Sequence, residues 1–182
     1  MNDRTILAAD VVSFWRNVGP EGWFKVDAAL DADIRARFLG LYETAAAGGL
    51  SAWEECAEGA LALLILLDQF PRNMFRGNAR AFATDAQARA IASRAILKGY
   101  DSVIPDMRGF FYLPFEHSED LADQERAIAL YKAAGDLEGL KWAEVHADVI
   151  RRFGRFPHRN AALGRATTPA ERKFLEEGGF SA

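Results

Sequence analysis

The densest group of ionisable side chains in the chain is one run of five polar residues: Glu116, His117, Ser118, Glu119 and Asp120. Carboxylates beside an imidazole are the groups that general acid–base catalysis uses, and carboxylates also bind divalent cations. A helix beginning at Ser118 explains the same residues as helix capping, with acidic groups in the first turn. A polar binding site is the second interpretation. Glu116 and His117 are adjacent and cannot share a helix face, so we expect no metal here.

A second set of candidates belongs to a motif that occurs twice. Phe-Pro-Arg-Asn stands at 70–73, and Phe-Pro-His-Arg-Asn stands at 156–160. Two copies suggest a duplicated unit, whereas the simpler alternative is that Phe-Pro recurs because it stops helices. The second copy lies among arginines, which form either a solvated face or a pocket for a carboxylate or phosphate. The candidate ligand-binding residues of the two motifs are Arg72, Asn73, Arg155, His158, Arg159 and Asn160.

Two further ionisable residues fall on apolar helical faces. Asp68 shares a face with leucines at the end of an expected helix, where the helix dipole disfavours an anion. We therefore expect Asp68 to be half-buried and to pair with Arg72 or Arg76, either to fix the turn or to bind a ligand. His146 lies on an apolar stripe, which is more typical of a hydrogen-bonded core histidine than of a ligand-binding one.

Composition excludes several classes of protein. The 182 residues include 22 basic and 26 acidic side chains, so no overall positive charge attracts nucleic acid or an anionic membrane. Cys56 is the only cysteine, and residues 1–10 contain no apolar stretch of the kind a signal peptide has. We expect a cytoplasmic protein without a cofactor; its oligomeric state is left open.

Residue usage and periodicity predict an all-α protein. Ala (33) and Leu (18) far outnumber Val, Ile and Thr (20 together). The pattern predicts about seven or eight helices in one domain spanning 1–182, with Trp23 and Phe24 in a loop and residues 101–117 in a loop that contains a turn or two of helix. Helix starts are expected at Thr5, Asp27, Ser51, Asp85, Ser118, Leu140 and Thr168, and Pro71 is expected to end the helix that begins at Ser51. The predicted core includes Leu64, Ile65, Leu67, Trp142 and Val149.

The four motif regions 67–73, 81–85, 111–120 and 153–160 together resemble the DUF924 family of bacterial and eukaryotic proteins of unknown function. The resemblance extends from Val11 to Pro169, with one departure at Arg16, where the family usually has an aromatic residue. It implies a tetratricopeptide-like array of helical hairpins. Members of the family have no established activity, so the resemblance marks residues without giving them roles.

Three functions are compatible with this sequence. The favoured one is a non-enzymatic binding module for a peptide, a protein segment or a small anionic ligand. The second is a hydrolase-like enzyme in which His117 or His158 acts with Glu116 or Asp120. The third is a purely structural polar network. No nucleotide-binding loop, nucleophile elbow or Cys-His pair is present in the sequence, which favours binding over catalysis.

Overall fold

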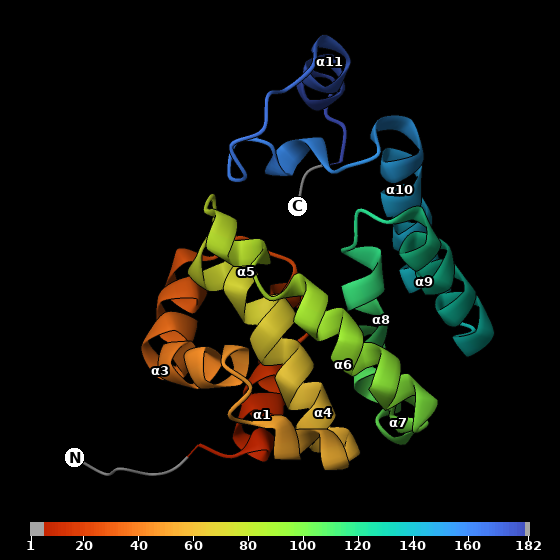
Figure 1. The fold of residues 1–182 in the computed structure, drawn as a ribbon. Coiled ribbons are helices and arrows are strands. Elements are labelled where there is room, and N and C mark those ends of the chain that lie inside the picture. The colour runs from red at the N-terminus through yellow and green to blue at the C-terminus, as the bar shows by residue number, and fades with distance from the viewer. Residues whose placement is uncertain (1–5, 181–182) are drawn as a thin grey trace. The chain divides into compact units, whose positions relative to one another are not determined.

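The computed structural model describes residues 6–180, and every regular element in that range is a helix (Figure 1). The predicted all-α class is therefore confirmed. The chain divides into two compact units. Unit 1 comprises residues up to 76 together with 80–111, and unit 2 comprises residues 77–79 together with those from 112 onward. The expectation of a single domain over 1–182 stays a prediction.

Unit 1 contains most of the helices. They are α1 (Ala8–Val18), α2 (Pro20–Trp23), α3 (Ala28–Ala46), the 3₁₀ helix η1 (Ser51–Glu55), α4 (Ala57–Leu64), the π-helical segment η2 (Ile65–Gln69), α5 (Phe70–Met74), α6 (Asp85–Leu97), α7 (Tyr100–Val103) and the 3₁₀ helix η4 (Pro105–Met107). Two more elements fall at the unit boundaries, the 3₁₀ helix η3 (Ala79–Phe82) and α8 (Gly109–Glu116).

Several predicted helix starts in unit 1 can be compared with the structure. Asp27 caps α3 as expected, because its carboxylate accepts hydrogen bonds from the N–H groups of Ala29 and Leu30. The predicted cap at Thr5 lies outside the described residues. Trp23 was expected in a loop, but it ends the short helix α2, which begins at Pro20. Proline suits the first turn of a helix because its fixed φ angle is already helical.

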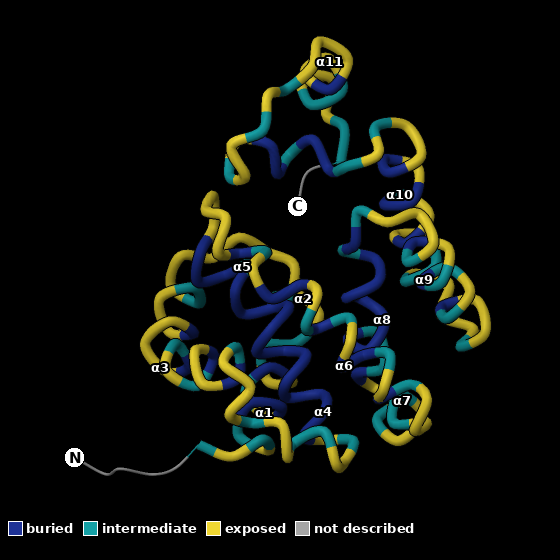
Figure 2. Tube along the Cα trace, in the orientation of Figure 1, coloured by how far each residue is buried: buried dark blue, intermediate teal, exposed yellow. Residues whose placement is uncertain are grey.

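The buried segment α4–η2–α5 is the centre of unit 1 (Figure 2). The prediction that Pro71 ends this helix is wrong, since α5 continues to Met74. The helix instead widens before the proline: the N–H of Phe70 donates to the carbonyl of Ile65, five residues back, in a π-helical turn. The wider turn accommodates a ring that would clash with the carbonyl four residues earlier in a regular α-helix.

The predicted core residues of unit 1 are all buried. Leu64, Ile65 and Leu67 have no exposed surface, and α4 packs against α1 and α6. The ring of Phe70 contacts those of Trp15 and Phe38, with centroid distances of 5.5 and 4.9 Å. This aromatic packing joins α1 and α3 to the central segment.

Unit 2 is built from a helical hairpin and a C-terminal helix. Its elements are α9 (Leu121–Ala134), α10 (Leu137–Phe153), the 3₁₀ helix η5 (Pro157–Arg159) and α11 (Pro169–Glu176). α9 and α10 pack along each other (Figure 1), joined by the left-handed Gly135 and by Asp136, which caps α10. The capping box predicted at Thr168 is confirmed, because Thr168 and Glu171 accept hydrogen bonds from each other's backbone N–H groups.

Residues 109–116, part of the expected loop with a turn or two of helix, form the eight-residue helix α8 with Pro114 inside it. Two expectations for α10 are wrong. Trp142 was predicted to be buried, but its exposed fraction is 46%, whereas Val149 is buried as predicted. The buried stripe of α10 is offset toward the small residues Ala143 and Ala147, which allow close contact between helices and leave the indole outside. α10 begins at Leu137, three residues before the expected start.

No helix among residues 6–180 is long and apolar enough to cross a membrane. The described helix pairs are compatible with helical hairpins, while the tetratricopeptide-like arrangement of the whole chain stays a prediction.

Candidate functional site

The first Phe-Pro motif belongs to an ionic network in unit 1. Asp68 is fully buried rather than half-buried, with an exposed fraction of 1%, and its Oδ1 lies 3.2 Å from the guanidinium of Arg72. The same guanidinium donates to both carboxylate oxygens of Asp85, each at 3.1 Å. Burial opposes the charge of Arg72, but the two aspartates outweigh it and raise its pKa above the ordinary value. The expected Asp68–Arg72 pair is confirmed.

The other polar residues of this turn bind a third aspartate. The side-chain amide of Asn73 donates to Asp31 at 2.8 Å, and Arg76 donates to both oxygens of Asp31. Arg76 therefore pairs with Asp31 in α3 and not with Asp68. The predicted ligand-binding groups Asp68, Arg72 and Asn73 all have partners within unit 1, and these contacts connect α5 to α3 and α6.

In unit 2, the cap of α9 lies two residues later than expected. Asp120, rather than Ser118, is the cap, because its Oδ1 accepts from the N–H of Ala122 at 2.8 Å. The Ser118 hydroxyl instead accepts from the N–H of Asp120 and donates to Asp123. Asp120 can occupy the cap because its backbone is extended, whereas the helix proper begins at Leu121.

Glu119 connects the start of α9 to the second Phe-Pro motif. Its two carboxylate oxygens accept from Arg165 at 2.7 and 3.0 Å, and Oε1 also accepts from the N–H of Phe156 at 2.8 Å. Burial raises the pKa of this carboxyl, but the hydrogen bonds and charge of Arg165 prevail, so that it lies below its ordinary value. Nothing in the sequence indicated that Glu119 and Arg165 are partners.

Arg155, the first basic residue of the second motif, is bound to α11. Its guanidinium donates to both carboxylate oxygens of Glu171, at 2.6 and 2.9 Å. The hydrogen bond from Arg155 is the main cause that lowers the pKa of Glu171 to about 2. Asn160 is fully buried; its amide donates to Glu171 at 3.3 Å, and its carbonyl oxygen accepts from Arg165 at 3.0 Å. Arg155 and Arg165 therefore each hold a carboxylate by two hydrogen bonds.

His146, which the sequence indicated only as a core histidine, lies against Glu116. Both residues are buried, and Nδ1 of His146 is 2.9 Å from Oε1 of Glu116 and 2.8 Å from the carbonyl oxygen of Trp142. A carbonyl oxygen can only accept, so Nδ1 carries the proton, and in the neutral imidazole Nε2 has the lone pair. Spacing along α10 could indicate that His146 faces inward, but not that α8 ends beside it.

The three histidines of the chain lie close together, and the rings of His146 and His158 both contact Phe156. Between ring centroids, His146 lies 6.2 Å from His117 and 5.6 Å from Phe156. His158, which belongs to the 3₁₀ helix η5, has its ring 5.6 Å from that of Phe156. We call His117, His146 and His158, together with Glu116, the histidine cluster. Residues 6–180 hold no group of three or more histidine, cysteine or acidic side chains placed to bind a metal ion.

Arg159 and burial control the charge of His158. The pKa of His158 is lowered to about 3, first because burial penalises the imidazolium and then because of the positive charge of Arg159. Arg159 itself is buried and lies over the ring of Phe156, 4.4 Å from its centroid. His158 is therefore a neutral imidazole at physiological pH: it can form hydrogen bonds, but it does not act as an acid.

The two Phe-Pro motifs have different backbones. Phe70 is helical, with φ −60° and ψ −35°, whereas Phe156 is extended, with φ −86° and ψ 109°. The expectation that they are structural copies is therefore wrong at this level, because the π-helical turn continues the first helix while Gly154 ends the second. The predicted convergence of the two motifs joins residues of different units and stays a prediction.

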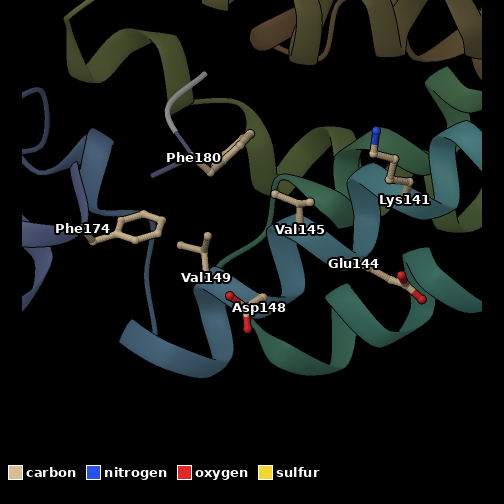
Figure 3. Close-up of a pocket in the computed structure, with 7 residues that line it drawn as sticks. All are labelled: Lys141, Glu144, Val145, Asp148, Val149, Phe174 and Phe180. Carbon is tan, nitrogen blue, oxygen red and sulfur yellow. The ribbon is translucent and has the colours of Figure 1, made fainter. Parts of the chain in front are cut away.

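Unit 2 contains a groove lined by seven side chains (Figure 3). Its volume is about 400 Å³, and Phe180 lines both the groove and the cluster, with its ring 4.2 Å from that of His146. Four apolar side chains and three charged ones from α10, α11 and the segment after it form the walls: Val145, Val149, Phe174, Phe180, Lys141, Glu144 and Asp148. Sequence reasoning missed Phe180, which carries no motif.

Comparison with known proteins supports the family resemblance. The family model described as "Bacterial protein of unknown function (DUF924)" matches residues 11–179. The chain is similar to the solved structure of a protein of unknown function, ATU0120, from Agrobacterium tumefaciens, with 53% sequence identity and a TM-score of 0.90 over 94% of this chain and 97% of that one. No curated protein matches it. The chain belongs to the DUF924 family of bacterial proteins of unknown function.

Proposed function

We propose that this protein is a binding module and that the histidine cluster of unit 2 is its site for a small polar molecule. The observation that carries the proposal is a set of buried polar atoms without hydrogen-bond partners in one region. They are Oε2 of Glu116, Oε1 of Gln124 and Nδ1 of His158. Leaving a buried polar group unpaired costs about 1–3 kcal/mol, so their concentration favours a ligand that completes them.

The connections between these atoms support a single site. The side-chain amide of Gln124 donates to the backbone carbonyls of Glu116 and Ser118, both at 2.6 Å, which places its oxygen near the end of α8. Glu116 in turn contacts His146, and the charges of His146 and His117 both influence the pKa of His158. The unpaired atoms therefore belong to one network rather than to scattered sites.

The charges favour a neutral polar ligand over the anion that the arginines first suggested. Arg155 and Arg165 are each bound through two hydrogen bonds to Glu171 and Glu119. An anion would have to displace a carboxylate that is already well placed. The unpaired carboxylate oxygen of Glu116 is an acceptor, so the ligand it would bind carries a hydrogen-bond donor.

A second candidate function is acid–base catalysis by His146. Glu116 orients its imidazole through Nδ1, which leaves the lone pair on Nε2 to accept a proton. His146, rather than His117 or His158, would then be the base. Asp120 caps α9, and with a pKa lowered to about 3 His158 is too weak a base at neutral pH, so neither residue suits the role first considered for it.

Ligand retention is the direct test. Native mass spectrometry of the chain as purified should detect a small molecule bound by the wild type and lost in Glu116→Gln, which keeps the shape but removes the charged acceptor. Glu125→Gln, the same change at an exposed position of α9, is the matched control. Circular dichroism should show that both variants remain folded. If folded Glu116→Gln retains every molecule that the wild type retains, the proposed site is wrong.

A further inference from the structure

Phe180 fills an aromatic slot at the edge of the histidine cluster. Its ring lies 4.2 Å from that of His146, 5.5 Å from His158 and 6.2 Å from Phe156, measured between centroids. The slot, defined by these three rings, therefore takes a flat aromatic group. On its other side Phe180 lines the groove between α10 and α11 (Figure 3).

A tight turn after α11 brings Phe180 to this position. Gly178 has a φ of +78°, a conformation that residues with a side chain rarely adopt. The N–H of Gly179 donates to the carbonyl of Phe174 at 2.8 Å, and a Cβ at Gly179 would come within 2.5 Å of Phe174. The last described residues are therefore held by one turn and by the ring of Phe180, which remains partly exposed.

We propose that the aromatic slot is the subsite for the ligand of the histidine cluster, that this ligand carries a flat aromatic ring with a hydrogen-bond donor, and that Phe180 occupies its place when it is absent. The inference rests on the proposed function and specifies its ligand. Tilted and edge-on contacts such as Phe180 makes with the rings of His146 and His158, at interplanar angles of 57° and 75°, account for the aromatic part. The unpaired Oε2 of Glu116, whose other carboxylate oxygen contacts His146, accounts for the donor.

Because Phe180 and the ligand compete for the aromatic slot, removing the Phe180 side chain should change the affinity for the ligand. A ligand that needs the slot binds only the fraction of molecules in which Phe180 has left it, and its apparent affinity falls by that fraction. Phe180→Ala removes the competitor and leaves the histidines and Glu116 unchanged. If the slot is open in about one molecule in ten, the variant binds about tenfold more tightly.

Three simple probes separate the two parts of the inference. Phenol has a ring and a donor, anisole has a ring without a donor, and cyclohexanol has a donor without an aromatic ring. Binding is followed by NMR through the imidazole carbon-bound proton signals. Phenol should bind the full chain and bind Phe180→Ala about tenfold more tightly, while anisole and cyclohexanol bind each protein more weakly than phenol does.

Phe174→Ala is the matched control, because Phe174 lines the same groove and packs against Phe153 rather than against the histidines. This variant should leave the affinity for phenol near that of the wild type. An equal gain in Phe174→Ala and Phe180→Ala would reflect general loosening and would overturn the inference. So would an unchanged affinity in Phe180→Ala, or equal binding of phenol and cyclohexanol.

The inference and the proposed function fail in different ways. If Glu116→Gln loses a retained molecule but phenol binds Phe180→Ala no more tightly than the wild type, the proposed site is correct and the proposed ligand class is wrong. If phenol binds Phe180→Ala and Glu116→Gln/Phe180→Ala equally well, Glu116 supplies no contact to the donor and the inference fails. Retention of every native molecule by folded Glu116→Gln removes the proposed function itself.

Discussion

The hydroxyl of Thr84 donates a hydrogen bond to the carbonyl oxygen of Leu67 at a distance of 2.6 Å. Residue 71, four positions after Leu67, would complete the regular helical hydrogen bond to this oxygen, but it is a proline and has no N–H. Thr84 precedes α6, so the start of one helix satisfies a carbonyl in the central segment of unit 1. The hydroxyl of the buried Thr84 therefore replaces the N–H that the buried Pro71 lacks.

Replacing Thr84 by Val should therefore destabilise the protein. Valine keeps the shape but removes the donor, and the buried carbonyl of Leu67 loses a partner. We expect the free energy of unfolding to fall by about 1–3 kcal/mol, measured by urea denaturation.

Thr44→Val is the matched control. The Thr44 hydroxyl also donates to a backbone carbonyl, that of Gly40 at 2.9 Å, but at an exposed position of α3. Water can replace this bond, so the control should change stability by less than about 0.5 kcal/mol. Equal losses in the two variants would contradict the special role of Thr84.

Two glycines in helices should respond to alanine in opposite directions. A Cβ at Gly59 in α4 would lie 2.1 Å from the backbone oxygen of Trp53, which cannot move without displacing η1. A Cβ at Gly40 in α3 meets nothing within 4 Å. Gly40→Ala should stabilise the protein by about 0.5–1 kcal/mol, and Gly59→Ala should destabilise it by more than about 2 kcal/mol. Thermal unfolding of both variants decides, and a stable Gly59→Ala would contradict the close packing of α4 on η1.

Local signals in the sequence were sufficient for much of the fold. The cap at Asp27 and the helix start at Thr168 each involve groups within four residues of one another, so residue types at fixed spacing determine them. The burial of Leu64, Ile65 and Leu67 was equally clear, since only a surrounded helix is apolar on every face.

Features that depend on distant residues could not be predicted in this way. Pro71 predicts a helix end because it has no N–H and its ring clashes with the preceding turn. The helix continues through it because the π-helical turn makes room for the ring and the hydroxyl of Thr84 binds the carbonyl of Leu67. Trp142 is exposed because α10 packs closely against α9 through the side that carries Ala143 and Ala147. Helical periodicity alone cannot show whether the buried stripe of α10 passes through Trp142 or through the residue next to it.

The candidate site was predicted in its parts but not in its pairings. The 116–120 run and the second Phe-Pro motif supply Glu116, His117 and His158, and all three belong to one cluster in unit 2. Its central residue, His146, was assigned to the core, which is correct as far as burial is concerned. Its contact with Glu116 joins positions 30 residues apart, and no spacing rule relates them.

Glu171 should make the protein sensitive to acid. The hydrogen bond from Arg155 lowers the pKa of Glu171 from 4.5 to about 2, so the folded state favours the carboxylate. Its contribution to stability is complete above about pH 4.5 and is lost as the pH falls toward about 2. Urea denaturation at a series of pH values should show a shallower acid limb for Glu171→Gln than for the wild type. Glu176→Gln, at an exposed position of the same helix, should follow the wild type, and an unchanged limb in Glu171→Gln would contradict the assignment.

His158 should stay neutral at a pH where an ordinary histidine is charged. Its pKa is lowered from 6.5 to about 3, chiefly by burial and then by Arg159, so the folded state resists protonation. The unfolded chain takes up the proton near pH 6.5, and the stability that the neutral imidazole contributes is therefore present above that pH and lost as the pH falls toward about 3.

NMR can follow this titration directly. The imidazole signal of His158, assigned by its disappearance in His158→Gln, should remain constant from about pH 8 to about pH 5. Arg159→Met removes the nearby positive charge while keeping an apolar side chain over Phe156, so it should raise the pKa of His158 but leave it below 6.5, because burial is the larger cause. A wild-type titration centred near 6.5 would mean that His158 is open to water, and its place as a buried, neutral member of the histidine cluster would be wrong.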